Sequence, residues 1–194
     1  MDDDDIARWL SAARNDDQAA WNRLVTRFNR LLWAVARSFR LGDAAAADAV
    51  QATWLKLVEN LDRIEKPDRL GSWLATTMRR ECLTQLRRDT RERPSATGEW
   101  IDEQPNPARP LDADLLDEER DAALWRALAT LAERCQRLLR VLMATPPPTY
   151  AEAAAALDLP IGSLGPMRQR CLAALRRAIA ADGVLTRADL PEWS

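Results

Sequence analysis

The sequence predicts an all-α protein with two small helical domains joined by a flexible linker. Apolar residues recur at spacings of three and four along most of the chain, as on the buried face of a helix. No segment shows convincing strand character. Between 94 and 110 the stretch PSATGEWIDEQPNPARP has four prolines and no period, which is typical of a linker. We therefore expect domains at 1–93 and 112–181, a linker at 94–111 and a tail at 182–194.

The composition is that of a globular chain. Apolar residues make up 47% and charged residues 30% of the 194 residues, enough for one ordinary domain or two small ones. No run of about 18 apolar residues is present, as a membrane span requires. The start, MDDDDIARWL, lacks the basic and apolar regions of a signal peptide. We expect a cytoplasmic protein.

Three long helices are expected in the N-terminal domain, where they form a small bundle. Asp16 or Asp17 can cap the first, which ends before Gly42. Its apolar positions are Trp21, Leu24, Val25, Phe28, Leu31, Leu32, Val35 and Phe39. Asp43 can open the second, with Val50, Trp54, Leu57 and Leu61 on one side. Before these, Asp2 to Asp5 can cap a short helix that begins at Ile6.

The third long helix follows a break that Pro67 imposes. Asp68 can cap it, and it continues to a basic end near Arg93. Its inward positions are Leu70, Trp73, Leu74, Thr77 and Met78, continued by Leu83 and Leu86.

The second domain begins near Asp112 with apolar positions from Leu124 to Leu142, and PPP at 146–148 stops this part. Thr149 can cap a short helix, YAEAAAAL, with Glu152 as its capping-box partner. The chain then turns at 158–160 before a longer helix. The inner side of that helix carries Ile161, Leu164, Cys171, Leu175 and Ile179.

A short helix, a tight turn and a longer helix with a basic outer face follow the helix-turn-helix plan, in which the second helix enters the major groove of DNA. Gly162 and Ser163 fall at the N-terminus of this helix, which favours a phosphate. Pro166 is tolerated if it lies in the first turn or so. The alternative is a plain helical hairpin with a solvated arginine face.

The net charge of −2 conceals two basic islands. Residues 79–93 hold six arginines against three acids, and residues 161–181 hold four arginines and no acid. Between them, residues 99–121 hold nine acids against two arginines, a net charge of −7. This pattern favours two cationic surfaces separated by an acidic segment.

The three cysteines are Cys82, Cys135 and Cys171, far apart in the chain and without any histidine. We interpret them as small buried apolar residues, with a redox switch or a metal site as the alternatives. No metal or cofactor is expected.

Residues 150–177 resemble region 4 of the extracytoplasmic-function (ECF) sigma factors of bacterial RNA polymerase, which belong to the sigma-70 superfamily. The first bundle resembles region 2 in FNRLLWAVARSF and in DAVQATWLKLVENLDRIEKPDRLGSWLATTMRRECLTQLRR. The resemblance covers roughly 16–91 and 120–180. It implies a transcription initiation factor that is not an enzyme. The partners that it implies are core polymerase (β′ clamp helices and β-flap), promoter DNA and an anti-sigma factor.

In region 2 the resemblance assigns the polymerase contact to Asp48, Gln51 and Trp54. The loop 60–67 would capture a base of the minus-ten element with Asn60, Asp62, Arg63 and Lys66. Arg79 and Arg80, with Arg87 and Arg88, would supply cations to the opened strand. Trp73 either stacks on a base or belongs to the core, and its place in the apolar series favours the core.

In region 4 the resemblance assigns base contacts at minus thirty-five to Gly165, Pro166, Gln169 and Arg170. Ser163 and Arg168 join this DNA-binding set, and Arg168 either touches phosphates or stays solvated. Members of the family often have Lys or Arg at 165 and Arg at 167. Gly165 and Met167 stand here, so we expect weak DNA binding without polymerase.

Other classes of function remain in competition. A stand-alone helix-turn-helix repressor or activator would need a dimerising or ligand-sensing segment, and none is visible. An adaptor that bridges proteins remains possible if the basic islands are only solvated faces. Enzymatic activity is disfavoured because the sequence has no histidine, no clustered cysteines and no Gly-rich phosphate loop.

Overall fold

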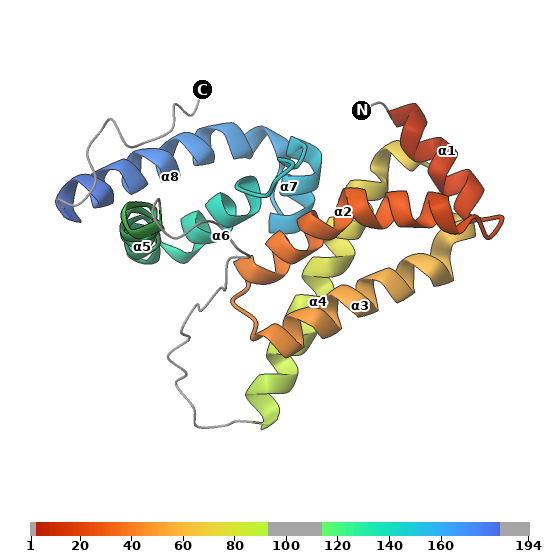
Figure 1. Cartoon of the computed structure of the whole chain (residues 1–194), viewed down its shortest axis with the longest axis horizontal. Helices are drawn as coiled ribbons and strands as arrows, with labels where there is room; N and C mark the ends of the chain where they lie inside the picture. The colour runs from red at the N-terminus through yellow and green to blue at the C-terminus, as the bar shows by residue number, and fades with distance from the viewer. Residues whose placement is uncertain (1–2, 93–113, 183–194) are drawn as a thin grey trace. The chain divides into compact units, whose positions relative to one another are not determined.

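The computed structural model describes residues 3–92 and 114–182, and all regular structure in these ranges is helical (Figure 1). This confirms the all-α fold class. The α-helices are α1 (Asp3–Ala13), α2 (Gln18–Ser38), α3 (Asp43–Asn60), α4 (Leu70–Glu92), α5 (Asp114–Ala129), α6 (Glu133–Leu142), α7 (Tyr150–Leu157) and α8 (Ile161–Asp182). Two 3-10 helices, η1 (Leu61–Arg63) and η2 (Pro67–Arg69), connect α3 to α4.

The chain divides into two compact units. Unit 1 joins residues 1–100 to 140–164, so it contains α1 to α4, α7 and the first turn of α8. Unit 2 joins 101–139 to 165–194, so it contains α5, most of α6 and the rest of α8. The expected boundaries at 1–93 and 112–181 stay a prediction. The linker at 94–111 and the tail beyond Asp182 lie outside the described residues.

The first two helices of unit 1 begin close to the expected positions. The carboxylate of Asp17 accepts hydrogen bonds from the backbone N–H groups of Ala19 and Ala20, which confirms Asp17 as the cap of α2. α1 begins at Asp3 rather than at Ile6, because the acids form its first turn instead of preceding it. An acid in this turn interacts favourably with the helix dipole.

The end of α2 and the start of α3 agree with the expectation. Arg40 takes a left-handed conformation with a φ of 55°, so the helix ends at Ser38, before Gly42. Gly42 is then the N-cap of α3 without any side-chain hydrogen bond, and Asp43 is the first helical residue. This confirms the prediction that Asp43 opens this helix.

The break before α4 is longer than expected. Pro67 opens η2 after Lys66 in extended conformation, and Asp68 lies inside this 3-10 turn. Asp68 is therefore not the cap of α4, which begins at Leu70. Proline at the start of a helical turn costs little because its missing N–H would be unpaired there.

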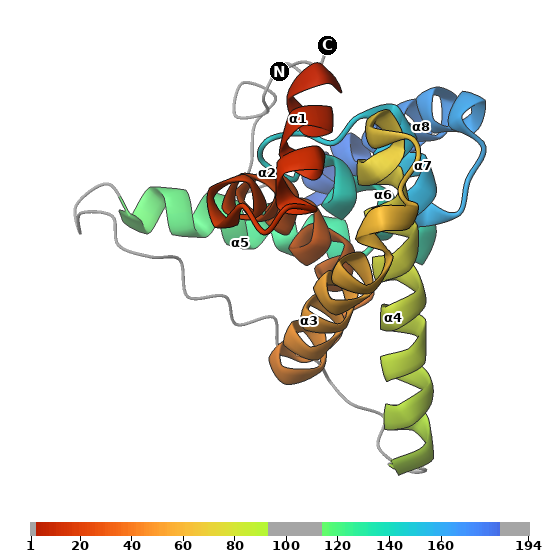
Figure 2. The same ribbon diagram turned by 90° about the vertical axis from the view of Figure 1, so that its right-hand side faces the viewer.

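The core of unit 1 lies between α2, α3 and α4, which Figure 2 shows with α3 beside α4. Its largest fully buried side chains are those of Leu24, Phe28, Leu32, Leu57, Leu70, Leu74 and Met78. Each such burial contributes about 1.5–3 kcal/mol relative to exposure. Trp54 and Trp21 meet edge to face, with ring centroids 5.8 Å apart, so α3 is also fixed to α2 at the rim of the core.

Helix α7 packs on α4 within unit 1. Thr149 and Glu152 form the expected capping box at its start. The carboxylate of Glu152 also lies 3.5 Å from the guanidinium of Arg27, and both side chains are largely buried. A Cβ on Gly71 of α4 would come within 2.1 Å of this carboxylate. The absence of a side chain at Gly71 therefore allows α7 to pack closely on α4.

In unit 2, α5 and α6 are separate helices. The side-chain amide of Gln136 donates to the backbone carbonyls of Ala129 and Leu131, which satisfies acceptors at the end of α5. The core contains Leu128, Leu138, Leu139, Leu172, Leu175 and Ile179. PPP at 146–148 lies beyond the end of α6, which stops earlier, at Leu142.

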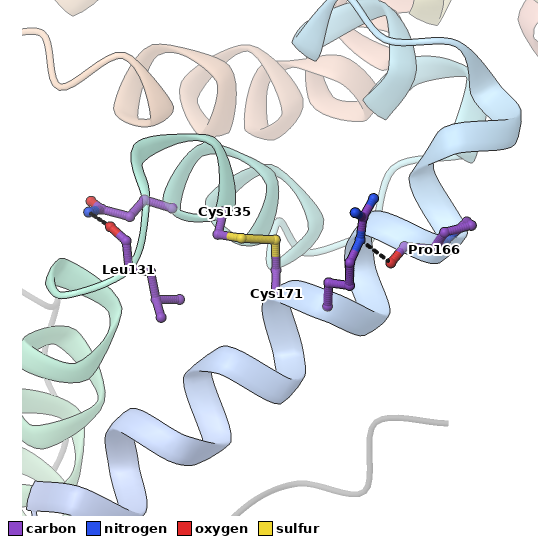
Figure 3. The surroundings of a disulfide bond; sticks show 6 residues. Leu131, Cys135, Pro166 and Cys171 are labelled. Carbon is purple, nitrogen blue, oxygen red and sulfur yellow. Dashed lines mark hydrogen bonds between the residues drawn. A yellow bond between two sulfur atoms is a disulfide. The ribbon is translucent and has the colours of Figure 1, made fainter.

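Two expectations for α8 were wrong. Pro166 lies in the second turn of the helix rather than the first, where it removes the N–H that would bond the carbonyl of Gly162. Cys171 and Cys135 are joined in a disulfide between α8 and α6 (Figure 3), rather than being separate apolar residues. Cys82 is free and buried, as expected.

Candidate nucleic-acid and polymerase interfaces

A surface pocket of about 240 Å³ lies where the chain passes from α3 to α4. Its lining residues are Asn60, Arg63, Ile64, Glu65, Lys66, Arg69 and Trp73. Three of the four expected loop residues are among them. Asp62 is exposed in η1 and is not part of the lining. The pocket thus combines an aromatic side chain, an amide, three cations and one carboxylate. The aromatic side chain and the polar groups suit an unstacked base, and the excess of cations suits its phosphate.

Trp73 is half-buried and lines this pocket. We expected Trp73 to belong to the core, as Leu70 and Leu74 do. Those two side chains are fully buried, whereas that of Trp73 is only partly buried. Helical spacing alone did not separate an inward position from one at the edge of the core.

Arg14, just beyond α1, supports one wall of the pocket. Its Nε donates to the carbonyl of Leu61 at 3.1 Å, and its Nη2 donates to the carbonyl of Ile64 at 2.5 Å. Leu61 is the first residue of the 3-10 helix η1, and Ile64, the residue that follows η1, lines the pocket. Nothing in the local sequence pattern pointed to Arg14, because its partners lie about fifty positions away.

The expected cations of α4 differ in their surroundings. Arg80, Arg87 and Arg88 are exposed, whereas Arg79 is partly buried. An Nη2 of Arg79 lies 2.7 Å from a carboxylate oxygen of Asp158, the left-handed residue that ends α7. In this arrangement the charge of Arg79 is already paired, while Arg80 faces solvent.

The exposed side of α3 carries the expected polymerase contacts Asp48 and Gln51. Trp54, the third expected contact, is half-buried and packs against Trp21. Only part of its side chain is therefore available to a partner. Leu55 and Val58 continue the exposed side, with more than half of each side chain accessible. We call Asp48, Gln51, Leu55 and Val58 the α3 ridge. Large apolar side chains in solvent are typical of an interaction site when they cluster.

In α8, Gln169 and Arg170 are exposed, as are Arg176 and Arg177. Arg170 Nε donates to the carbonyl of Pro166 at 3.4 Å, one turn earlier. Gly165 has open space around it, and Met167 is buried in place of a surface cation. The Ser163 hydroxyl donates to the carbonyl of Pro160 at 2.7 Å, and Arg168 is half-buried. A cationic outer face is therefore present on α8.

Residues 24–92 match the model of the family described as sigma-70 region 2. Two solved structures are similar over nearly their whole length. The sigma factor RpoE from Bartonella quintana, solved with the anti-sigma factor NepR, is 24% identical with a TM-score of 0.61, covering 84% of this chain and 98% of its own. CnrH, solved with the cytosolic domain of CnrY, is 26% identical with a TM-score of 0.59, covering 93% of this chain and 99% of its own.

Residues 24–92 of the chain are therefore a sigma-70 region 2, and the chain is similar to ECF sigma factors over most of its length. Region 2 runs from Leu24 in α2 to Glu92, the last residue of α4, so both the pocket and the α3 ridge lie within it. α1 and Arg14, which follows it, precede the match. No curated protein sequence matches the chain significantly.

Three features of these candidate interfaces were not predicted from the sequence. They are the extra pocket residues Ile64, Glu65 and Arg69, the apolar part of the α3 ridge, and Arg14. One signal in the sequence could have indicated the apolar part of the α3 ridge. On a helical wheel Leu55 and Val58 share one side of the helix, and the buried Leu57 lies on another.

In the described ranges no helix is long and apolar enough to cross a membrane.

Proposed function

We propose that the chain is a sigma factor that directs bacterial core RNA polymerase to specific promoters. Region 2 captures an unpaired base of the minus-ten element in the pocket between α3 and α4. The outer face of α8 contacts bases of the minus-thirty-five duplex at Gly165, Pro166, Gln169 and Arg170. Ser163 and Arg168 contribute further contacts to this DNA. Good bidentate contacts from such side chains are each worth about 1–3 kcal/mol of discrimination between bases.

The observation that carries this proposal is the pocket itself. It lies inside the region 2 match, and Trp73 lines it together with Arg63, Lys66 and Arg69. A base that leaves the duplex loses stacking, and an aromatic face replaces it while the cations hold the phosphates. The exposed Arg80, Arg87 and Arg88 extend the cationic surface along α4.

The α3 ridge is the proposed polymerase contact. Its two exposed aliphatic side chains, flanked by Asp48 and Gln51, resemble a small apolar interface with a polar rim. Because RpoE was solved in complex with an anti-sigma factor and CnrH in complex with the cytosolic domain of CnrY, we also propose an anti-sigma factor as a partner.

The decisive experiment is run-off transcription by bacterial core polymerase with the purified chain on a promoter library. We expect initiation at defined start sites only when the chain is present. Tight and specific duplex binding by the chain alone, without association with core polymerase, would instead identify a stand-alone repressor.

The pocket is tested in the same assay with Trp73→Ala. Loss of one base–aromatic stack costs about 1–3 kcal/mol, so open-complex formation should fall about 5- to 150-fold. Trp125→Ala, on an exposed tryptophan of α5, is the matched control and should leave initiation unchanged. Equal activity of the Trp73 variant and the parent chain would remove the pocket from promoter opening.

A further inference from the structure

The disulfide between Cys135 and Cys171 joins two helices that are far apart in the sequence. The two Cα atoms lie 5.2 Å apart, and the residues are separated by 36 positions. Cys135 stands in the first turn of α6, and Cys171 lies on the buried side of α8, one residue after Arg170 (Figure 3). Neither residue is required by the region 2 match, which ends at Glu92.

We propose that Cys135 and Cys171 form a reversible redox modification site. A hydroperoxide oxidises the two thiols to the disulfide, and cellular thiols reduce it again. Intracellular disulfides, where they occur, are usually transient and serve catalysis or redox sensing, because glutathione and thioredoxin keep thiols reduced. A protein that works beside RNA polymerase is exposed to that reducing pool.

The surroundings of the cysteines indicate which sulfur reacts first. Cys135 is half-buried in the first turn of α6, where the helix dipole favours negative charge and the one acid of the turn, Glu133, is paired with Arg137. Cys82 is the opposite case, because burial in α4 raises the pKa of its thiol to about 12. Cys82 therefore stays protonated and inert under conditions in which Cys135 reacts.

The proposed chemistry balances in two steps. The Cys135 thiolate attacks the hydroperoxide and takes up one oxygen, which gives a sulfenic acid and, after protonation, an alcohol or water. The Cys171 thiol then attacks the sulfenic sulfur, the S–S bond forms, and one water leaves. The hydroperoxide is reduced by two electrons, and the two thiols together are oxidised by two.

The position of Cys171 links this chemistry to α8. The inner face of the helix is otherwise held by aliphatic contacts of Leu172, Leu175 and Ile179, which are non-directional. A covalent bond fixes the axial position and rotation of α8 on α6 directly beside the exposed Gln169 and Arg170. If these two residues read DNA, as the proposed function holds, oxidation strengthens minus-thirty-five recognition by ordering them.

The site is tested first by thiol chemistry, which does not depend on the proposed function. The full chain is treated with hydrogen peroxide or dithiothreitol, and its cysteines are then alkylated under denaturing conditions and identified by mass spectrometry. We expect Cys135 and Cys171 to be protected only after peroxide and Cys82 to be alkylated in both samples. Oxidation should also raise the melting temperature of unit 2 by roughly 10 °C.

Alkylation of both Cys135 and Cys171 after peroxide, or a disulfide that dithiothreitol does not reduce in the folded chain, would overturn the proposal. The second test compares run-off transcription by the oxidised and reduced chains on promoters with and without a minus-thirty-five element. Oxidation should raise initiation several-fold on the former alone. Cys135→Ser and Cys171→Ser should each abolish this difference, and Cys82→Ala should keep it.

The two tests separate the possible failures. Absence of transcription in both redox states, with a reversible disulfide, rejects the proposed function but supports the site. Equal transcription in both states, with the disulfide formed, rejects the link from this site to α8 while the proposed function stands.

Discussion

Arg14 shows how one side chain outside the region 2 match contributes to the pocket inside it. Its guanidinium binds two carbonyls of the loop 61–64, and α1, which it follows, packs on η2 at 67–69. Both segments flank the pocket. A planar guanidinium suits this task because it presents several donors in a fixed geometry, whereas an ammonium is a point charge.

At this scale we predict that Arg14→Ala loosens the loop without unfolding the bundle. Hydrogen bonds from charged groups contribute about 1.5–3 kcal/mol, and the exposure of Arg14 lowers this. Binding of a single-stranded minus-ten oligonucleotide by the holoenzyme should therefore weaken about three- to tenfold. Arg14→Lys should give an intermediate loss, measured by fluorescence anisotropy.

Arg8→Ala is the matched control for Arg14. Arg8 is exposed and pairs with Asp5 within α1, so its removal should leave oligonucleotide binding unchanged. Unchanged binding by the Arg14→Ala holoenzyme would contradict a positioning role for Arg14.

Among the elements, the approach of α7 to α4 depends on Gly71. The carboxylate of Glu152 serves two purposes at this contact, because it caps α7 at Thr149 and lies near the guanidinium of Arg27. A buried carboxylate with such partners tolerates little displacement, since leaving it unpaired is costly. A Cβ on Gly71 would therefore displace the Glu152 side chain, which is buried and cannot move away at low cost.

We predict that Gly71→Ala destabilises unit 1 by about 1–3 kcal/mol, as expected for overpacking in a filled core. Gly162→Ala provides the control, because the position is helical and a Cβ there meets no atom within 4 Å. That change should be neutral or stabilise by up to about 1 kcal/mol. Urea denaturation monitored by circular dichroism distinguishes the two, and a neutral Gly71→Ala would show that α7 does not pack closely on α4.

In the molecule as a whole, the two candidate surfaces of region 2 belong to one compact unit. The pocket is built from the end of α3, the two 3-10 turns and the start of α4, while the ridge lies along α3 itself. One rigid bundle thus carries both the proposed polymerase contact and the proposed base site. Capture of the base is then tied to a fixed position on polymerase.

Single substitutions on the ridge test this arrangement. Leu55→Asp and Val58→Asp should each weaken binding to core polymerase at least about tenfold, because interface centres concentrate the binding free energy. Their folding stability should change by less than about 0.5 kcal/mol, since both side chains are exposed. Ala44→Asp, exposed near the start of α3, is the control. Binding measured by surface plasmon resonance that is unaffected at both positions would place the polymerase contact elsewhere.

The local features of this protein could be predicted from the sequence. Asp17, the Thr149–Glu152 capping box and the turn at Asp158 were all predicted, and the structure confirms them. Each depends on interactions within four residues, which the sequence spells out directly. The errors at Asp68 and Pro166 arose near helix ends, where several neighbouring residues can fulfil the same requirement.

By itself the sequence determined the helical fold class, the capped ends of α2 and α7, and the basic and acidic segments, because periodicity, caps and charge are local properties. The tertiary structure alone decided that Trp73 reaches a pocket, that Arg14 supports its wall, and that Cys135 meets Cys171. These contacts join residues tens of positions apart. They exist because burial of the apolar helix faces brings those positions together, and no local pattern specifies which distant partner each will meet.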